Sequence, residues 1–150
     1  MYNLIRLLHV AATVLFLGNI VAGVYWKLRA DRTGDGNIIA STLDTIARSE
    51  RVMTLPSAAV LFLTGIGLAR LAGLSLLGTP WLAASIGLFA MSGLVFALIV
   101  TPLQRRLRAA ALEAGRPEYQ RLSWWWEVAG WTSIASSVAA LVLMVLKPWT

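Results

Sequence analysis

Four long apolar runs divide this chain and limit the folds open to it. They cover about residues 4–26, 52–72, 80–101 and 125–146. Each run has close to the ~20 residues that a helix needs to cross a hydrocarbon core of ~30 Å. Backbone groups inside lipid must be hydrogen-bonded within the protein, and the runs lack the alternation of a barrel strand. The sequence therefore predicts an all-α fold, a single integral membrane domain over residues 1–150 built as an antiparallel four-helix transmembrane bundle.

The composition agrees with a membrane protein and excludes several kinds of site. Hydrophobic residues make up 58% of the chain and charged residues 13%, whereas a soluble domain is roughly half apolar and about a quarter charged. The net charge of +6 then indicates orientation and contact with anionic lipid headgroups, not nucleic-acid binding. Because the chain has no cysteine, disulfides, thiolate metal sites and cysteine nucleophiles are excluded.

Basic residues are concentrated in two of the three loops. The loops after the first and third spans carry five Lys or Arg each, ten in total, against three on the other side. They are Lys27, Arg29, Arg32, Arg48 and Arg51 in one loop, Arg105, Arg106, Arg108, Arg116 and Arg121 in the other, and Arg6, Arg70 and Lys147 opposite. Since loops rich in basic residues stay in the cytoplasm, both termini of this multi-pass protein are expected outside.

Both basic loops are expected to contain cytoplasmic helical extensions of the spans. In the first loop, Ser41 or Thr42 is the expected N-cap of a surface helix that runs into the second span. A bend is predicted at Leu55–Pro56 because proline interrupts helical hydrogen bonding. In the second loop, residues 104–114 are expected to extend the third span into the cytoplasm.

The single histidine, His9, is the main candidate for chemistry. It lies near the outer end of the first span, with Thr13 on the same helical face. Asn19 lies roughly 80° round the helix from it. One interpretation is structural, in which His9 hydrogen-bonds a neighbouring helix. The other is functional, in which His9 ligates haem iron or copper or relays protons, with Thr13 and Asn19 orienting the bound group.

Met91 and Met144 are the candidates for a second ligand to a metal bound by His9. At 1.5 Å per residue, His9 lies about 8 Å below the outer end of its span, Met144 about 3–5 Å and Met91 about 16 Å. Helix tilt can absorb both offsets, and Met144 is slightly closer in depth. Haem iron accepts histidine with methionine, or histidine alone, so one histidine is sufficient.

A stripe of small residues marks one face of the fourth span. Gly130, Ser133 and Ser137 recur at helical spacing, which favours close helix packing with hydroxyl groups bonded across the interface. The alternative interpretation is a cleft, lined by Ser133 and Ser137, for a flat cofactor or a small polar substrate. Glu127, at the inner end of this span, is expected to reach toward Arg121 or the loop arginines.

Several short motifs carry a resemblance that extends over the whole chain. They are Leu8-His9-Val10, Phe16-Leu17-Gly18-Asn19, Leu28-Arg29-Ala30-Asp31-Arg32, Thr64-Gly65, Thr79-Pro80-Trp81 and Lys147-Pro148-Trp149. In this order they resemble the bacterial membrane family catalogued as domain of unknown function 2269. That family has no established activity, and it implies a location in the bacterial cytoplasmic (inner) membrane.

A more distant likeness concerns two better-known membrane families. Leu8-His9 and Thr64-Gly65 are similar to motifs of the haem-binding protoporphyrinogen oxidase family and of the copper-resistance membrane domain. The likeness implies that His9 is the functional histidine and that haem b is its ligand. Because the chain has one histidine, a haem held by two histidines would need two protomers, as in a homo-oligomer.

Three functions from different classes follow. The first is a haem-b redox protein that binds its cofactor through His9. The second is a copper-handling protein or a small-molecule transporter, in which His9 acts with methionine. The third is a non-catalytic membrane scaffold or partner subunit. The residues alone do not decide whether the protein is an enzyme.

The expected orientation is tested with a C-terminal fusion to a reporter that is active only in the cytoplasm. Because ten basic residues lie on the two inner loops and three on the other side, the reporter is expected to be inactive. A periplasm-active reporter fused at the same residue is the control and is expected to be active. The opposite pattern would reverse the orientation and move His9 to the inner face.

Overall fold

The computed structural model describes residues 1–113 and 116–148, and its ordered elements there are helical. They are α1 (Tyr2–Asp31), α2 (Gly36–Ser49), η1 (Glu50–Thr54), α3 (Leu55–Leu71), α4 (Pro80–Val95), η2 (Phe96–Val100), α5 (Thr101–Leu112) and α6 (Arg116–Leu146). Four helices in this part of the chain are long and apolar enough to cross a membrane, over Tyr2–Asp31, Gly36–Leu71, Pro80–Leu112 and Pro117–Leu146. The all-helical prediction with four such helices is confirmed.

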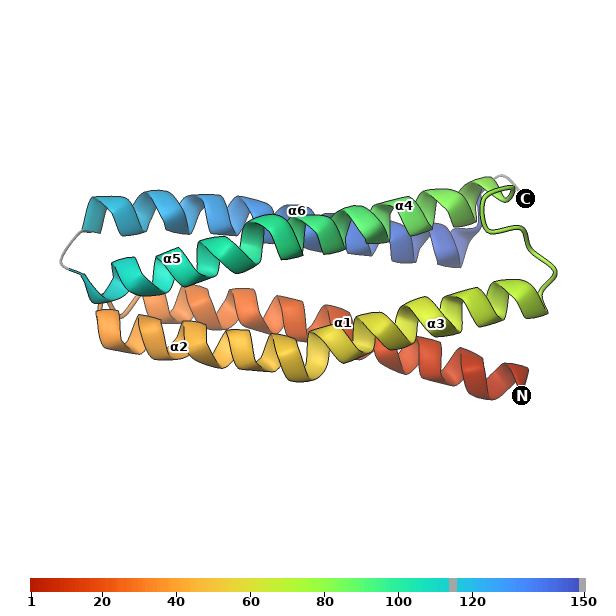
Figure 1. Cartoon of the computed structure of the whole chain (residues 1–150), viewed down its shortest axis with the longest axis horizontal. Helices are drawn as coiled ribbons and strands as arrows, with labels where there is room; N and C mark the ends of the chain where they lie inside the picture. The colour runs from red at the N-terminus through yellow and green to blue at the C-terminus, as the bar shows by residue number, and fades with distance from the viewer. Residues whose placement is uncertain (114–115, 149–150) are drawn as a thin grey trace.

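The helices form one elongated bundle of two helix pairs (Figure 1). In one pair α1 packs along α2, η1 and α3, and in the other α6 packs along α4, η2 and α5. Contacts between α2 and α5 and between α1 and α6 join the two pairs. Both chain ends lie at one end of the bundle, and the turn between α1 and α2 lies at the other (Figure 1).

Two single π-helical turns, η1 and η2, lie just before prolines of the second and third spans. η1 directly precedes Pro56, and η2 directly precedes Pro102. Proline lacks an N–H and its ring collides with a carbonyl of the preceding turn, and a widened turn relieves both problems. As a result α2, η1 and α3 form one continuous helix, and α4, η2 and α5 form another.

The helix after the first span differs from the predicted surface helix in two respects. It begins at Gly36, earlier than Ser41 or Thr42, because Asp35 caps it: the Asp35 carboxylate accepts hydrogen bonds from the backbone N–H of Asn37 at 2.8 Å and of Ile38 at 3.3 Å. The helix also belongs to the bundle and not to the surface, since one of its faces is buried against α1 and α5.

The largest hydrophobic core lies toward the α2–α5 end of the bundle and reaches into the apolar runs at Val24, Val100 and Ile134. It combines residues of α1, α2, α5 and α6, among them Leu43, Leu107 and Trp126, which are 1%, 0% and 2% exposed. Two smaller clusters lie toward the other end, around Phe16 and around Trp81. Apolar burial drives folding where water is the alternative solvent, and the largest core accordingly lies toward the end of the bundle where the helices continue past the apolar runs.

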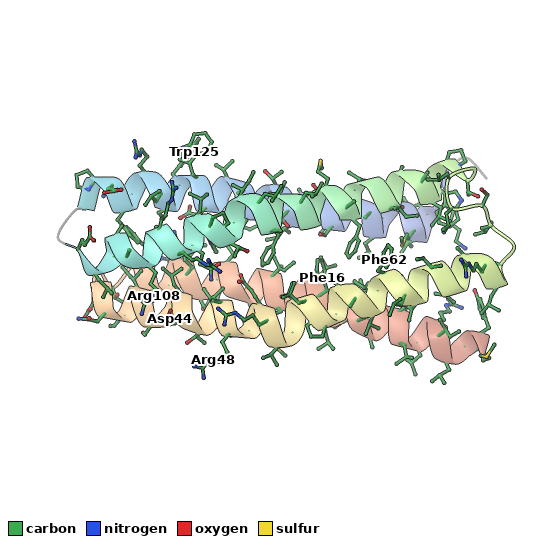
Figure 2. The ribbon with its side chains drawn as sticks, in the orientation of Figure 1. Phe16, Asp44, Arg48, Phe62, Arg108 and Trp125 are labelled. Carbon is green, nitrogen blue, oxygen red and sulfur yellow. The ribbon has the colours of Figure 1, made fainter. Side chains whose placement is uncertain are left out.

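The helices of the apolar runs leave many large apolar side chains uncovered. Val14, Phe62 and Leu98 are 66%, 59% and 70% exposed. In a bilayer these side chains face lipid. Figure 2 shows the side chains around the bundle, including Arg108 and Asp44, which form an ion pair at 2.6 Å between α5 and α2.

The small-residue face of α6 is an interhelical packing surface. Ser133 and Ser137 are 1% and 5% exposed, and each hydroxyl lies 2.8 Å from the Ser92 hydroxyl on α4. The Ser92 hydroxyl is also 3.0 Å from the Ser133 carbonyl oxygen. The packing interpretation of this stripe therefore agrees with the structure, because the three hydroxyl groups bond one another across the α4–α6 interface.

The contact between Gly36 on α2 and Ala111 on α5 can be tested by substitution. A Cβ added at Gly36 would lie 2.0 Å from the Ala111 carbonyl oxygen, so Gly36→Ala is expected to push the two helices apart and destabilise the protein by about 1–3 kcal/mol. The measurement is the midpoint of thermal unfolding in detergent. Gly87→Ala in α4 is the control, because its Cβ would meet nothing within 4 Å. That change is expected to stabilise the protein by about 0.5–1 kcal/mol, and equal effects of the two changes would contradict the close approach.

Candidate functional site

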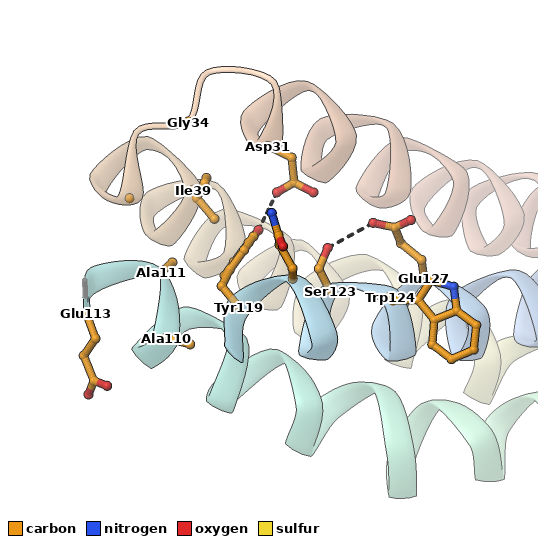
Figure 3. Close-up of a pocket in the computed structure, with 12 residues that line it drawn as sticks. Asp31, Gly34, Ile39, Ala110, Ala111, Glu113, Tyr119, Ser123, Trp124 and Glu127 are labelled. Atoms are coloured by element: carbon orange, nitrogen blue, oxygen red, sulfur yellow. Dashed lines mark hydrogen bonds between the residues drawn. The ribbon is translucent and has the colours of Figure 1, made fainter. Parts of the chain in front are cut away.

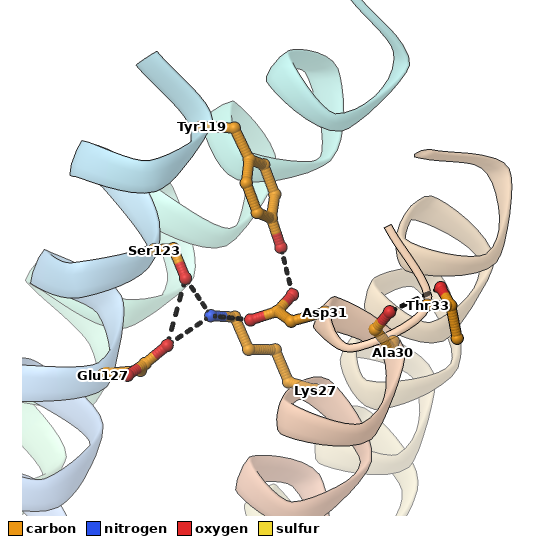
Figure 4. A network of polar contacts seen from close by, with 7 residues as sticks. All are labelled: Lys27, Ala30, Asp31, Thr33, Tyr119, Ser123 and Glu127. Carbon is orange, nitrogen blue, oxygen red and sulfur yellow. Dashed lines mark hydrogen bonds and ion pairs between the residues drawn. The ribbon is translucent and has the colours of Figure 1, made fainter. Parts of the chain in front are cut away.

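The centre of the candidate site is Lys27, a fully buried lysine in α1. Its side chain is 0% exposed, and its Nζ lies 2.7 Å from Asp31 Oδ2 and 2.7 Å from Glu127 Oε1 (Figure 4). From the sequence, Lys27 was expected in a loop and Glu127 near Arg121. Both expectations are wrong, because α1 continues to Asp31 and carries Lys27 onto the face that packs against α6.

Two hydroxyl groups complete the network around Lys27. The lysine donates a hydrogen bond to Ser123 Oγ, and Ser123 donates to Glu127 Oε1 at 3.0 Å. The Tyr119 hydroxyl donates to Asp31 Oδ1 (Figure 4). All three donors of the ammonium group are thereby used, on Asp31, Glu127 and Ser123. The Trp126 ring centroid is 5.5 Å from Nζ, close enough for a cation–π interaction.

Helical spacing brings these residues together. Lys27 and Asp31 are four residues apart on α1, and Tyr119, Ser123 and Glu127 are spaced by four on α6. Residues four apart lie on the same helical face, so two polar stripes meet when α1 packs against α6. The spacing of these residues can be read from the sequence. It indicates a shared polar site only when α1 and α6 are known to pack on these two faces.

The network contains more negative than positive charge. One lysine is paired with two carboxylates, Asp31 and Glu127, which leaves a formal charge of −1 (one positive minus two negative). A partly buried site with an uncompensated charge is costly. The arrangement therefore favours a further cation beside the carboxylates.

A cavity of about 680 Å³ lies next to the network at the α2–α5 end of the bundle (Figure 3). Asp31, Glu113 and Glu127 line it, which is three of the seven acidic residues of the chain. The other described lining residues are neutral, and they include the aromatic side chains of Tyr119 and Trp124. The volume is in the range of sites for small organic ligands, about 300–1,000 Å³.

His9 has a separate polar contact at the other end of the bundle. Its Nδ1 lies 2.8 Å from Thr64 Oγ1, and the Thr64 hydroxyl donates to the Val60 carbonyl oxygen at 2.6 Å. When the Thr64 hydroxyl donates to Val60, the His9 tautomer that carries its proton on Nδ1 is the one that can donate to Thr64. This leaves the lone pair of His9 Nε2 available to accept a proton or bind a metal.

The other residues expected near His9 have different neighbours. Thr13 donates to the backbone oxygen of His9 at 2.8 Å, and Asn19 Nδ2 donates to Thr54 Oγ1 at 2.8 Å. Met91 is 43% exposed on α4, and Met144 packs against the cluster around Trp81. The structure places Ser133 and Ser137 in the serine cluster with Ser92 and not beside His9. Within residues 1–113 and 116–148, no three His, Asp or Glu side chains are grouped to hold a metal ion.

A family model described as a predicted integral membrane protein matches residues 3–148. No curated protein matches the chain, and no solved structure matches it.

Removing the buried cation tests the Lys27 network. Lys27→Met leaves Asp31 and Glu127 without their shared partner, and breaking a buried pair in this way costs about 3–5 kcal/mol. We expect a large drop in the midpoint of thermal unfolding in detergent. Arg108→Met is the control, because it breaks an ion pair whose two side chains are about half exposed, and such surface pairs contribute little. A small effect of Lys27→Met would show that the network does not hold α1 to α6.

Proposed function

Because this chain belongs to the DUF2269 family of predicted integral membrane proteins, we propose a function for it within the membrane, the binding of a small organic cation in the acidic cavity. In this proposal binding is one step in the movement of that cation across the bilayer. Of the functions considered from the sequence, this corresponds to a small-molecule transporter.

One observation carries the proposal, the concentration of acidic residues at the cavity. The chain has thirteen basic and seven acidic residues, yet Asp31, Glu113 and Glu127 line this cavity and its other described lining residues are neutral. Lys27 lies behind the carboxylates, fully buried, and does not neutralise both of them. A positively charged ligand would supply the missing charge.

The lining residues also suit the shape of an organic cation. Glu127 uses Oε1 for Lys27 and Ser123 in the described contacts, so its second oxygen is available to accept from an ammonium or guanidinium group. The aromatic faces of Tyr119 and Trp124 can attract the same charge. A quaternary ammonium, which has no N–H donor, would be held by the charge of the carboxylates and by the aromatic faces.

In the proposed orientation, the cavity lies on the cytoplasmic side of the membrane. With the basic loops in the cytoplasm, the cavity opens to the cytoplasm and His9 lies near the outer surface. The exposed Trp124 and Trp125 would then lie at the inner headgroups of the bacterial cytoplasmic membrane, where aromatic side chains are enriched and anionic lipids attract the loop arginines.

Ligand-induced stabilisation tests cation binding. Choline, a primary amine and a guanidinium compound are each added to the purified protein, beside the uncharged carbon isostere of choline and a carboxylate of similar size. At roughly one hundred times Kd, a ligand stabilises the folded state by about 2.7 kcal/mol. We expect stabilisation by at least one cation and none by the neutral or anionic compounds.

Two variants and a control connect that stabilisation to the cavity. Glu113→Gln and Glu127→Gln are expected to abolish it, because both side chains line the cavity. Glu118→Gln, an exposed residue of α6 that does not line the cavity, is expected to retain it. Equal stabilisation by the neutral isostere, or none by any cation, would refute the proposal and leave the scaffold interpretation.

A second candidate function has its own supporting observation, the His9–Thr64 hydrogen bond. Metal-ligating histidines usually donate their second ring N–H to a fixed acceptor, and the Thr64 hydroxyl, 2.8 Å from His9 Nδ1, is placed to be that acceptor. A haem b held through His9 Nε2 would fit this geometry. Because Met91 and Met144 have other surroundings, a site with His9 as the single protein ligand is favoured over one with methionine.

The visible spectrum of the protein supplied with haem tests this second function. The parent is expected to show a Soret band, His9→Ala to lose it, and Thr64→Val to bind haem about 10–100-fold more weakly because the ring orientation is no longer fixed. A colourless parent, or an unchanged band in His9→Ala, excludes haem binding through His9.

A further inference from the structure

We infer that four arginines on the adjoining outer faces of α2, η1 and α5 form a binding site for a phospholipid whose headgroup carries two phosphates. They are Arg48, Arg51, Arg105 and Arg108, here called the arginine surface, and all four are exposed. None of them lines the acidic cavity, so this site is separate from the one proposed for a cation and does not depend on it.

Helical spacing places the four arginines in two neighbouring rows. Arg48 lies four residues after Asp44, and Arg51 lies three residues after Arg48. Arg105 and Arg108 are three residues apart on α5. Residues three or four apart lie on one face of a helix. The rows meet where Arg108 Nε donates to Asp44 Oδ1 at 2.6 Å, and Figure 2 shows Arg48, Asp44 and Arg108 on the same side of the bundle.

The arginine surface carries an excess of positive charge. Arg108 is paired with Asp44, and in the described part of the chain the other three arginines have no ion pair. The formal charge is +3 (four positive minus one negative). It is still +2 when Glu50, which precedes Arg51 and lines a small internal cavity, is included as a carboxylate. Because Arg108 uses its Nε for Asp44, its two terminal amino groups can donate to a phosphate.

The arginine surface lies at the level expected for lipid phosphates. The apolar run of the second span begins at about residue 52, directly after Arg51, and the run of the third span ends at about residue 101, four residues before Arg105. Long basic side chains at the ends of apolar runs extend to the headgroups. Within the runs, Val52 and Leu98 are 68% and 70% exposed. A lipid, which has both a phosphate and acyl chains, therefore fits this surface better than a free anion does.

A headgroup with two phosphates matches the arginine surface better than a headgroup with one. Guanidinium groups bind phosphate oxygens through two parallel hydrogen bonds, and the two rows offer each phosphate an arginine from each helix. Basic sites between membrane helices on the cytoplasmic side suit such headgroups. Diphosphatidylglycerol has this chemistry. Bound here, it would connect α2 with α5, which belong to different helix pairs, and so hold the two pairs together.

Lipid titration of the purified full-length protein in detergent tests the site. Diphosphatidylglycerol is expected to raise the midpoint of thermal unfolding more than phosphatidylglycerol does at equal phosphate concentration. Phosphatidylcholine with the same acyl chains is expected to leave the midpoint unchanged. Inorganic phosphate and pyrophosphate are the free-anion probes, and neither is expected to have an effect at that concentration. Added salt should weaken the effect of diphosphatidylglycerol, because the arginines are exposed.

A matched pair of variants on α5 connects the effect to the arginine surface. Arg105→Gln is expected to weaken the binding of diphosphatidylglycerol about fivefold, the usual effect of one basic residue near anionic lipid. Arg48→Gln on α2 is expected to have a similar effect. Arg106→Gln removes the same charge from the next residue, but Arg106 is turned about 160° away from Arg108 on the helix. This control is expected to bind with wild-type affinity.

Four results would overturn the inference. They are stabilisation by phosphatidylcholine equal to that by diphosphatidylglycerol, stabilisation by pyrophosphate equal to that by the lipid, equal effects of the two glycerol lipids at equal phosphate concentration, and equal effects of Arg105→Gln and Arg106→Gln. The first three are measured on the wild-type protein, so the test does not depend on the folding of a variant.

Discussion

The contact of α1 with α6 depends on the charge of Lys27. An ammonium group that is 0% exposed is tolerated only when oxygen atoms surround it, and these come from its own helix and from α6. The same interface carries Trp126, which lies over the lysine and belongs to the largest hydrophobic core. Polar pairing and apolar packing therefore hold the same two helices at the same level of the bundle.

The two ends of the bundle are stabilised in different ways. At the α2–α5 end, a large apolar core, an Asp35 cap and the Lys27 network resemble the interior of a soluble helix bundle. Toward the chain termini, the cores are smaller and large apolar side chains are uncovered. There the helices are joined by serine hydroxyl groups and by small residues, as expected where lipid replaces water. The two π-helical turns lie between these regions and follow from the two prolines.

The proposed cation cavity and the Lys27 network share Glu127, which lines the cavity and pairs with Lys27. A charge bound in the cavity would therefore act on a carboxylate that also holds α1 to α6. His9 and Thr64 are in the opposite region of the bundle, so a metal bound there would act independently of these carboxylates.

The apolar runs by themselves determined the fold class. A continuous apolar run of this length must hydrogen-bond its own backbone inside lipid, and an α-helix does this. The close packing of Ser133 and Ser137 was also predictable from the spacing of small residues. The π-helical turns were not, although proline at two positions indicated where regular helix would fail. The start of α2 at Gly36 was missed because Ser41 or Thr42 was expected to be the N-cap, whereas Asp35 caps the helix.

Only the tertiary structure decided which polar residues form a site. Lys27 counted as a loop residue in the sequence because a basic side chain after an apolar run is normally exposed. Tyr119, Ser123 and Glu127 lie more than ninety positions further along the chain, and no local pattern relates them to Lys27. Helical periodicity specifies which residues share a face, but the pairing of one face with another depends on how four helices pack together. For that reason the sequence led to His9, while the structure led to the carboxylates around Lys27.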